Sequence, residues 1–442
     1  MFETLFQLLS ELPPDGRALL LPSECIPMAT LRRDASLLAQ HSQLPKGCRI
    51  ALCGLSPLKL IKAVIAFDGT VNVMLLLPAS MDARTTNQLI QSSHCTHRID
   101  ALLDEPESIA SLLNLPLRDE APTRWLLASS GTTGTPKLIE HTLASLCRSV
   151  KRDTVCGSEF VWGLLYDPCR FAGMQVVLQA LLSTSGLCVS ESMDFDTQIT
   201  GFIANKVNAL SATPSLWRRL LMDGRIAELP LRQITLGGET VDQNILDALK
   251  HAFPVARVIH IYASTEVGTG FSVHDGFAGF PANWIDSVIA PLPLRVREDG
   301  HLLVKPWILP GGKEILDRVD ADGYLDTQDL VRVEGDRVFF LGRASGAINV
   351  GGNKVNPEEI ECCIREVEGV YDVRVYAKKN SIMGQIVAAE VVSAIEVEPE
   401  PLRKSIQRHC RSHLENWQVP VFISFVTALK ETSSGKRERL PV

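Results

Sequence analysis

Short apolar runs of strand length alternate with amphipathic helical patterns along the first two thirds of the chain. Between the runs, segments such as Thr197–Lys206 and Asp242–Ala252 repeat their apolar residues at helical spacing. Such alternation predicts a layered α/β fold built on largely parallel sheets. The predicted strands are Arg49–Cys53, Val71–Leu77, Arg124–Ala128, Cys188–Ser190, Ala209–Ala212, Gln233–Leu236 and Val258–Ile261.

The pattern changes after Ala290, where short alternating strands are separated by Gly, Asp and Pro. These strands are expected at Leu302–Lys305, Arg332–Val333 and Val338–Leu341. Because they follow one another without helical segments between them, we predict a β-rich subdomain at the end of the large N-terminal domain.

The residues beyond Gly342 predict a small α+β unit. Its expected elements are helices at Pro357–Glu366 and Pro401–Leu414, and strands near Val370–Tyr376 and Ile386–Val392. We therefore expect an N-terminal domain over residues 1–341, a hinge over 342–346 and a C-terminal domain over 347–442.

Composition and charge exclude several classes of protein. A chain of 442 residues is too long for one ordinary core, and a net charge of -7 leaves no basic excess to bind a nucleic acid backbone. No apolar run approaches the stretch of about 20 residues that crosses a bilayer. The 11 cysteines include no CxxC pair, and we expect reduced thiols in a cytoplasmic protein without nucleic acid or membrane partners.

A loop of hydroxyls, glycines and one lysine follows the strand that ends at Ala128. Glycines let backbone N–H groups approach phosphate oxygens, hydroxyls donate further hydrogen bonds, and lysine adds positive charge. A flexible turn is one alternative. A P-loop NTPase is another, but Pro136 replaces its second glycine and Leu138 replaces its magnesium-binding hydroxyl. The loop residues are Ser129, Ser130, Gly131, Thr132, Thr133, Gly134, Thr135, Pro136 and Lys137.

This loop resembles the signature phosphate loop of the superfamily that contains acyl-CoA synthetases, adenylation domains and luciferases. Further segments resemble the motifs of that family in the family's order, and the resemblance covers residues 124–436. The first 120 or so residues contain no such motif and are similar only in their general sequence pattern. These segments are Gly237–Glu239, Tyr262–Glu266, Tyr324–Asp329, Gly342–Arg343, Gly351–Glu361 and Ser434–Lys436.

The resemblance implies an enzyme that uses ATP and Mg²⁺ to convert a small carboxylic acid to its acyl-AMP with release of pyrophosphate. The acyl group then passes to a thiol, supplied by coenzyme A or by the phosphopantetheine arm of an acyl carrier protein. The small C-terminal domain is implied to be a mobile lid that rotates about the hinge between the two half-reactions. We expect an acid–thiol ligase.

The same resemblance assigns nucleotide-binding residues. The loop Ser129–Gly134 and Lys137 would hold the phosphates, and Gly238 and Glu239 would lie on the adenine side, where Tyr262 could stack on the base. Asp329 could accept hydrogen bonds from both ribose hydroxyls, although an Asp in such a sequence also commonly forms a turn. Arg343 would contact the nucleotide.

The reaction itself is attack of a carboxylate on the α-phosphorus, so its transition state needs positive charge more than a base. By resemblance, Lys436 supplies that charge, although a tail lysine is ordinarily a solvated surface group. Thr265 could bind the α-phosphate, and Glu266 could hold magnesium. Rotation of the lid would replace Lys436 with the thiol-channel residues Gly351, Gly352 and Lys354.

Arg170, Phe171 and Gly173 belong to a segment that borders the acid pocket in the family, where a His usually aligns with Arg170. A guanidinium there could pair with a second carboxylate of the substrate or form an internal salt bridge. Asp167 could be compared with the aspartate that binds an amino group in amino-acid adenylation domains, but the spacing to Gly186 fits acyl-CoA ligases better.

Three positions depart from the family pattern. Ala263 replaces the glycine of the Tyr-Gly motif, Gln328 replaces the glycine before Asp329, and Ser345 stands where the hinge usually has an Asp. None removes a group that touches the reacting atoms. A stand-alone enzyme that loads a separate carrier protein, and a catalytically silent nucleotide-binding homologue, are alternatives to the ligase.

Overall fold

The computed structural model describes residues 3–22, 24–42, 44–100, 107–108, 121–128, 136–307, 313–380, 384–394 and 398–430. Two groups of predicted site residues, Ser129–Gly134 and Lys436, lie outside this part of the chain. Within it, no helix combines the length and the apolar character that crossing a bilayer requires.

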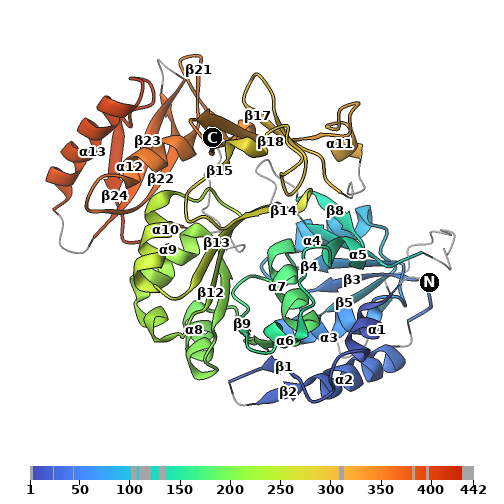
Figure 1. Cartoon of the computed structure of the whole chain (residues 1–442). Helices are drawn as coiled ribbons and strands as arrows, with labels where there is room; N and C mark the ends of the chain where they lie inside the picture. Colours follow the sequence, from blue (N-terminus) through green and yellow to red (C-terminus); the bar gives the residue numbers. More distant parts are fainter. Residues whose placement is uncertain are drawn as a thin grey trace.

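A six-stranded sheet forms one layer of the N-terminal region, in the order β6-β5-β3-β4-β7-β8 (Figure 1). The inner strands are parallel, and β6 and β8 are antiparallel edges. Strand β4 is buried at all five positions, which explains its unbroken apolar run. The strands are β3 (Arg49–Cys53), β4 (Val73–Leu77), β5 (His97–Asp100), β6 (Glu107–Ser108), β7 (Arg124–Ala128) and β8 (Leu138–His141), with helices α1 (Leu5–Ser10), α2 (Met28–His41), α3 (Pro57–Phe67) and α4 (Ala83–Ser92).

An eight-stranded sheet follows, in the order β14-β13-β12-β11-β9-β10-β1-β2, with β2 and β14 as antiparallel edges. Its strands are β1 (Arg17–Leu20), β2 (Cys25–Pro27), β9 (Val161–Gly163), β10 (Gly186–Cys188), β11 (Ala209–Ala212), β12 (Gln233–Gly237), β13 (Arg257–Ser264) and β14 (Gly268–Val273). The helices are α5 (Leu143–Leu146), α6 (Thr154–Gly157), α7 (Phe171–Leu182), α8 (Phe195–Ala204), α9 (Pro214–Asp223) and α10 (Gln243–Ala252).

Helix α7 lies between these two sheets (Figure 1). Nine of its 12 residues are buried, so the helix is apolar on nearly all sides, as a helix inside a core must be. One continuous core joins Leu52 of β3, Met174 of α7 and Leu210 of β11. The two sheets are therefore packed through a shared helix and present their strand ends to a common region.

Two further sheets complete the fold. An antiparallel sheet contains β15 (Phe280–Pro281), β16 (Leu294–Val296), β17 (His301–Val304), β18 (Leu325–Glu334) and β19 (Arg337–Arg343), and α11 (Lys313–Leu316) lies in the same region. The C-terminal sheet contains β20 (Ile348–Val350), β21 (Asn353–Val355), β22 (Val370–Asn380), β23 (Gly384–Ser393) and β24 (Phe422–Phe425), with helices α12 (Pro357–Arg365) and α13 (Pro399–His413). The buried members of its separate core all lie between Ile348 and Ile423.

The structure confirms the predicted fold class, a layered α/β region followed by a β-rich part and a small α+β unit. Strands β3, β7 and β11 have the predicted bounds. The strand predicted at Cys188–Ser190 ends instead at Cys188, and β13 extends to Ser264. The hairpin β1–β2 was not predicted; β1 joins the eight-stranded sheet by pairing with β10, a contact between residues far apart in the chain.

The predicted hinge lies where one sheet ends and another begins. Strand β19 ends at Arg343, a single 3-10 turn covers Ala344–Gly346, and β20 starts at Ile348. Gly342 has a φ of 120°, and a Cβ on it would lie 2.3 Å from a carboxylate oxygen of Glu358. Glycine suits this point, because another residue would be strained at this φ and would displace the Glu358 side chain. The domain bounds themselves stay a prediction.

A buried cluster of charges holds the C-terminal unit against α9 and α10, which lie directly beneath it in Figure 1. The Asp242 carboxylate is 2.5 Å from Arg218 and 2.9 Å from Arg365 of α12. The two arginine side chains are only 8% and 6% exposed. Asp372 is 4.0 Å from each of them. Burial by itself would raise the pKa of Asp242, but the two guanidinium groups hold it at about 2. This ion cluster therefore couples the domains.

We expect Asp242→Asn to lower the free energy of unfolding by about 3 kcal/mol, because it leaves buried guanidinium charge without its main partner. The asparagine can still accept the hydrogen bond that Asp242 receives from the Ile245 amide at the start of α10, so the helix cap is kept. Urea unfolding measures the change. Glu366→Gln, which removes an exposed carboxylate that pairs with His409, is the control and should change stability by less than about 1 kcal/mol. Equal stability of Asp242→Asn and wild type would show that the cluster does not stabilise this arrangement.

Candidate active site

A cavity of about 600 Å³ opens between α7 and the face of the eight-stranded sheet. Its lining includes Ala128 at the end of β7, Gly237 and Gly238 at the end of β12, and Thr265 just after β13. These are the carboxyl ends of parallel strands, where α/β sheets commonly bind ligands. The strand that leads into residues 129–135 thus ends at the same cavity as two strands of the other sheet.

Arg170 connects the start of α7 to the end of β7 at this cavity. It lies just before the first residue of α7, and its Nη1 donates a 2.9 Å hydrogen bond to the carbonyl of Ala128. Arg170 and Phe171 both line the cavity, and their contact with the acid stays a prediction. Gly173 does not line it; a Cβ there would lie 2.2 Å from the Asp167 carbonyl oxygen. Gly173 therefore lets α7 pack closely on the loop that precedes it.

The predicted adenine-side residues occupy the turn after β12. Gly238 has a φ of 82°, a left-handed conformation that glycine adopts without strain. Glu239 accepts a 3.0 Å hydrogen bond from the Ser215 amide in the first turn of α9, where a carboxylate interacts favourably with the helix dipole. Glu239 thus fixes the turn to α9, a structural contact that the sequence did not reveal.

Asp329 is held from two sides. Its Oδ2 accepts a 2.7 Å hydrogen bond from the Tyr262 hydroxyl, and its Oδ1 accepts one of 3.2 Å from Arg343 Nε. Burial raises the pKa of Asp329, while Arg343 and Tyr262 oppose that rise. The Asp329 side chain is 14% exposed. The structure therefore brings together three predicted nucleotide-binding residues, from the eight-stranded sheet, from β18 and from the hinge.

The packing of the Tyr262 ring supports its contact with Asp329. Its ring stacks at 5.1 Å against both Phe271 and Phe340, and Tyr262 is not among the residues lining the cavity. These contacts fix the hydroxyl that points at Asp329 (2.7 Å). The predicted stacking of Tyr262 on adenine stays a prediction, whereas its contact with Asp329 is a further role that the sequence did not indicate.

Gln328, which replaces the family's glycine, is one of the few non-glycine residues with a left-handed backbone, at a φ of 63°. It lies in a β-bulge, because the register of β17 with β18 shifts between His301 and Leu303. The amide of Gln328 donates to the Asp326 carboxylate at 2.8 Å. Glycine avoids the cost of this conformation, about 1 kcal/mol, so the departure from the family pattern retains the backbone shape at some cost in stability.

His141 was missed by the sequence analysis. It is the last residue of β8 and is buried, with Nε2 3.0 Å from the Thr265 carbonyl oxygen and its ring 5.5 Å from that of Phe171. Burial lowers the pKa of His141 to about 4, so at neutral pH it is uncharged and donates to that carbonyl through Nε2–H. His141 thus anchors the Thr265–Glu266 turn. A histidine after a phosphate loop gives no specific signal in one sequence.

The other predicted residues lie apart from this group. Lys137 is exposed directly before β8, and Gly351 and Gly352 form the two-residue turn of the β20–β21 hairpin, with φ of 57° and 94°. Lys354 is exposed on the same hairpin. Neither the hairpin nor Lys137 is among the residues lining the cavity, and β21 lies at the outer end of the C-terminal unit (Figure 1).

Two models of known protein families match this chain. The family model for the AMP-binding enzyme matches residues 61–297, and the model for the AMP-binding enzyme C-terminal domain matches residues 359–436. A 2-succinylbenzoate–CoA ligase of Listeria monocytogenes serotype 4b is 25% identical over 362 residues, which are 77% of this chain and 76% of the relative. The mitochondrial acyl-coenzyme A synthetase ACSM2B of Homo sapiens is 24% identical over 414 residues, 86% of this chain and 70% of the relative.

Solved structures share the fold. NpsA of Klebsiella oxytoca, in complex with 3-hydroxyanthranilyl-AMSN, superposes with a TM-score of 0.79 at 16% identity and covers 100% of this chain and 98% of its own. ATP-bound MatB from Rhodopseudomonas palustris gives a TM-score of 0.75 at 18% identity, covering 98% of this chain and 96% of its own. At these identities the likeness concerns the fold alone.

We expect Tyr262→Phe to weaken nucleotide binding by about tenfold, because it removes a hydrogen bond to a charged group without altering the ring packing. Calorimetric titration with ATP measures the change. Tyr376→Phe, in β22, is the control and should bind ATP as wild type does. Wild-type affinity of Tyr262→Phe would mean that the Tyr262 hydroxyl does not set the position of Asp329 for the ligand.

Proposed function

Because the chain belongs to the AMP-binding enzymes of the adenylate-forming superfamily, we propose that it joins a carboxylic acid to AMP within the cavity beside α7 and then transfers the acyl group to a thiol. The single observation that carries this proposal is the meeting of three strand ends at one cavity. Ala128, Gly238 and Thr265 all line it, and Arg170 fastens the first of these strand ends to α7 through a 2.9 Å hydrogen bond.

ATP would bind with its ribose on Asp329. Each carboxylate oxygen of Asp329 already accepts one hydrogen bond, from Tyr262 and from Arg343, and each can accept another. The two ribose hydroxyls can fill these positions. The base would lie beside Gly238, whose lack of a side chain permits close approach. The triphosphate would then extend toward Ser129–Gly134 and Lys137.

Arg170 and Phe171 would position the acid. The acid's carboxylate would attack the α-phosphorus, forming an acyl–oxygen–phosphorus link as the bond to the pyrophosphate oxygen breaks. Negative charge on the transferring group needs compensation by cations and donors. Thr265 lines the cavity, and its hydroxyl would donate to the α-phosphate, while Lys436 would supply the positive charge.

Magnesium fits the groups that are present. Mg²⁺ is usually held by one or two carboxylates together with substrate phosphates and water. Glu266 follows Thr265 directly, and its charge interacts with those of Arg343 and Asp329. Glu266 would hold the ion, which would neutralise charge on the pyrophosphate leaving group.

The second half-reaction requires a different arrangement. A thiol must reach the acyl carbonyl and displace AMP, so the group that assisted adenylation must leave the site. We propose that the C-terminal domain turns about residues 342–346 and brings the Gly351–Lys354 hairpin to the thiol. Coenzyme A and carrier-bound phosphopantetheine present the same thiol, and a carrier-loading enzyme is the second candidate for the acceptor step.

We also propose a cytoplasmic protein. All eleven cysteines are free thiols, which suits a reducing compartment. The proposed partners are an organic acid and a thiol carrier, without nucleic acid or membrane.

The direct experiment is acid-dependent pyrophosphate release with a panel of aromatic, hydroxy, dicarboxylic, amino and medium-chain acids. We expect Lys436→Ala to lower adenylation by about 10²- to 10³-fold, the usual loss when a group that stabilises transition-state charge is removed. Transfer from preformed acyl-AMP to the thiol should change much less. Lys430→Ala, which removes an exposed lysine a few residues earlier, is the matched control.

Two other outcomes would contradict the proposal. Release of ADP and orthophosphate would indicate phosphoryl transfer from the γ-position. ATP binding without turnover of any acid would favour the silent nucleotide-binding homologue. Comparing coenzyme A with a carrier protein that bears a free phosphopantetheine thiol then separates the two thiol candidates.

A further inference from the structure

The cavity extends far beyond the space beside the strand ends. Along β12 its lining runs from Gly238 and Gly237 back to Thr235 and Gln233, at the opposite end of the same strand. At a rise of about 3.3 Å per residue, Gln233 and Gly237 are about 13 Å apart. Ala172, Gln175 and Gln179 line it along α7. The cavity is therefore a channel between a helix and a sheet.

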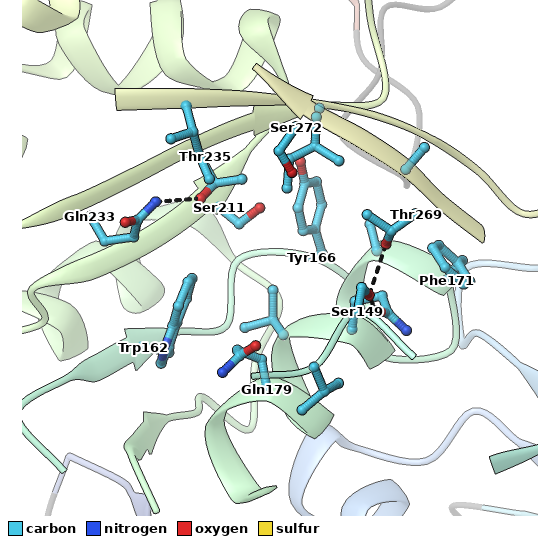
Figure 2. A pocket seen from close by; sticks show the side chains of 18 of the residues that line it. Ser149, Trp162, Tyr166, Phe171, Gln179, Ser211, Gln233, Thr235, Thr269 and Ser272 are labelled. Atoms are coloured by element: carbon cyan, nitrogen blue, oxygen red, sulfur yellow. Dashed lines mark hydrogen bonds between the residues drawn. The ribbon is translucent and has the colours of Figure 1, made fainter. Parts of the chain in front are cut away.

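Polar side chains line part of this channel, between apolar residues such as Val176 and Ile259. Gln233, Thr235, Ser211 and Trp162 project from the sheet into the channel, and Gln179 of α7 lies across from them (Figure 2). Gln233 Nε2 donates to Thr235 Oγ1 at 3.2 Å. Ser149 Oγ donates to Gln175 Oε1 at 2.9 Å and lies 3.0 Å from Thr269 Oγ1, whose hydroxyl can donate to it. A channel for an unsubstituted fatty chain would be lined by apolar groups throughout.

The far end of the channel, near Gln233, is basic. Lys151, Arg257 and His274 all line it and are exposed to solvent. Arg257 is the first residue of β13, opposite Gln233, and its Nη2 is 3.2 Å from His274 Nδ1. The pKa of His274 is lowered by its partial burial and then by Arg257 and Lys151. The positive charges of Arg257 and Lys151 thus contribute to the lowered pKa of His274.

Nearby acidic groups are engaged elsewhere. Asp153 also lines the channel, and its Oδ1 accepts hydrogen bonds from the Val155 and Cys156 amides at the start of α6. Asp275, the neighbour of His274, lies 2.5 Å from Arg337. With His274 neutral, the two cations Lys151 and Arg257 face one carboxylate, Asp153, so a net positive charge remains at the channel end.

From this arrangement we propose that the substrate is an elongated acid with a second anionic group at its far end, recognised by Arg257 and Lys151. The proposal rests on the proposed adenylation function, which fixes the reacting carboxylate at the other end of the channel, near Thr265. A spacing of about 13 Å corresponds to a chain of roughly ten bonds. Trp162 and Gln179 along the walls would accommodate an aromatic or hydroxylated spacer.

The test compares α,ω-dicarboxylic acids with monocarboxylic acids of the same length, by acid-dependent exchange of pyrophosphate into ATP. For wild type, we expect kcat/KM for the diacids to rise with length to a maximum near ten bonds and to exceed that of the matched monoacids there. Arg257→Gln and Lys151→Gln should each lower the ratio of diacid to monoacid kcat/KM by at least about fivefold, mainly through KM. Arg84→Gln, at an exposed position that does not line the channel, is the control and should leave the ratio unchanged.

Arg257→Glu tests whether the preferred substrate changes with the charge at this position. Reversal of the charge should make an acid with a distal amine a better substrate than the diacid of equal length. Adenylation of monoacids and diacids with equal efficiency, or equal ratios in wild type and the Arg257 and Lys151 variants, would overturn this inference and leave the proposed function intact. Exchange with no acid of either series would instead count against the proposed function.

Discussion

The carboxylate of Asp329 is the point on which three parts of the molecule depend. Tyr262 reaches it from the eight-stranded sheet, Asp329 itself belongs to β18 of the antiparallel sheet, and Arg343 lies at the start of the hinge. A largely buried carboxylate is stable only when hydrogen bonds and a counter-charge compensate for the lost water. The proposed ribose site and the start of the proposed hinge therefore depend on the same carboxylate.

This dependence connects domain movement to chemistry. The interface cluster around Asp242 binds the C-terminal unit to α9 and α10 through Arg365, while Arg343 binds the beginning of the hinge to Asp329. Rotation about residues 342–346 would have to break the first contact and could retain the second. The nucleotide site would then stay intact, while the C-terminal domain would turn a different face toward it. Ser345, exposed in the 3-10 turn Ala344–Gly346, carries no charge that would tie the turn to either orientation.

Much of the fold could be predicted from the sequence because its strands have distinct apolar patterns. Strand β4 is buried throughout and reads as a continuous apolar run, and α10 begins at Gln243, directly after its capping residue Asp242. The hairpin β1–β2 could not be predicted in the same way, because its pairing with β10 depends on residues more than 160 positions later in the chain. Local propensity carries no information about such a contact.

The residues of the candidate site also divide into those that the sequence could predict and those that it could not. Arg170 and Thr265, named from motifs, line one cavity, and Thr265 directly follows β13, whose apolar pattern the sequence shows. The supporting contacts were not predictable: His141 beneath Thr265, Glu239 against α9 and the basic end of the channel all join segments that are distant in sequence. Gly173 was expected beside the acid, but its closest constraint is packing against the Asp167 carbonyl.

The central claim is that the acid's own oxygen becomes bonded to the α-phosphorus. It is tested most directly with an active acid labelled with oxygen-18 at both oxygens of the reacting carboxylate. The acid is incubated with ATP and a thiol acceptor, and the nucleotide is analysed by mass spectrometry. The account predicts AMP that carries one oxygen-18 atom, since AMP departs with the oxygen that the carboxylate supplied. Unlabelled AMP, or label in orthophosphate together with ADP, would contradict it.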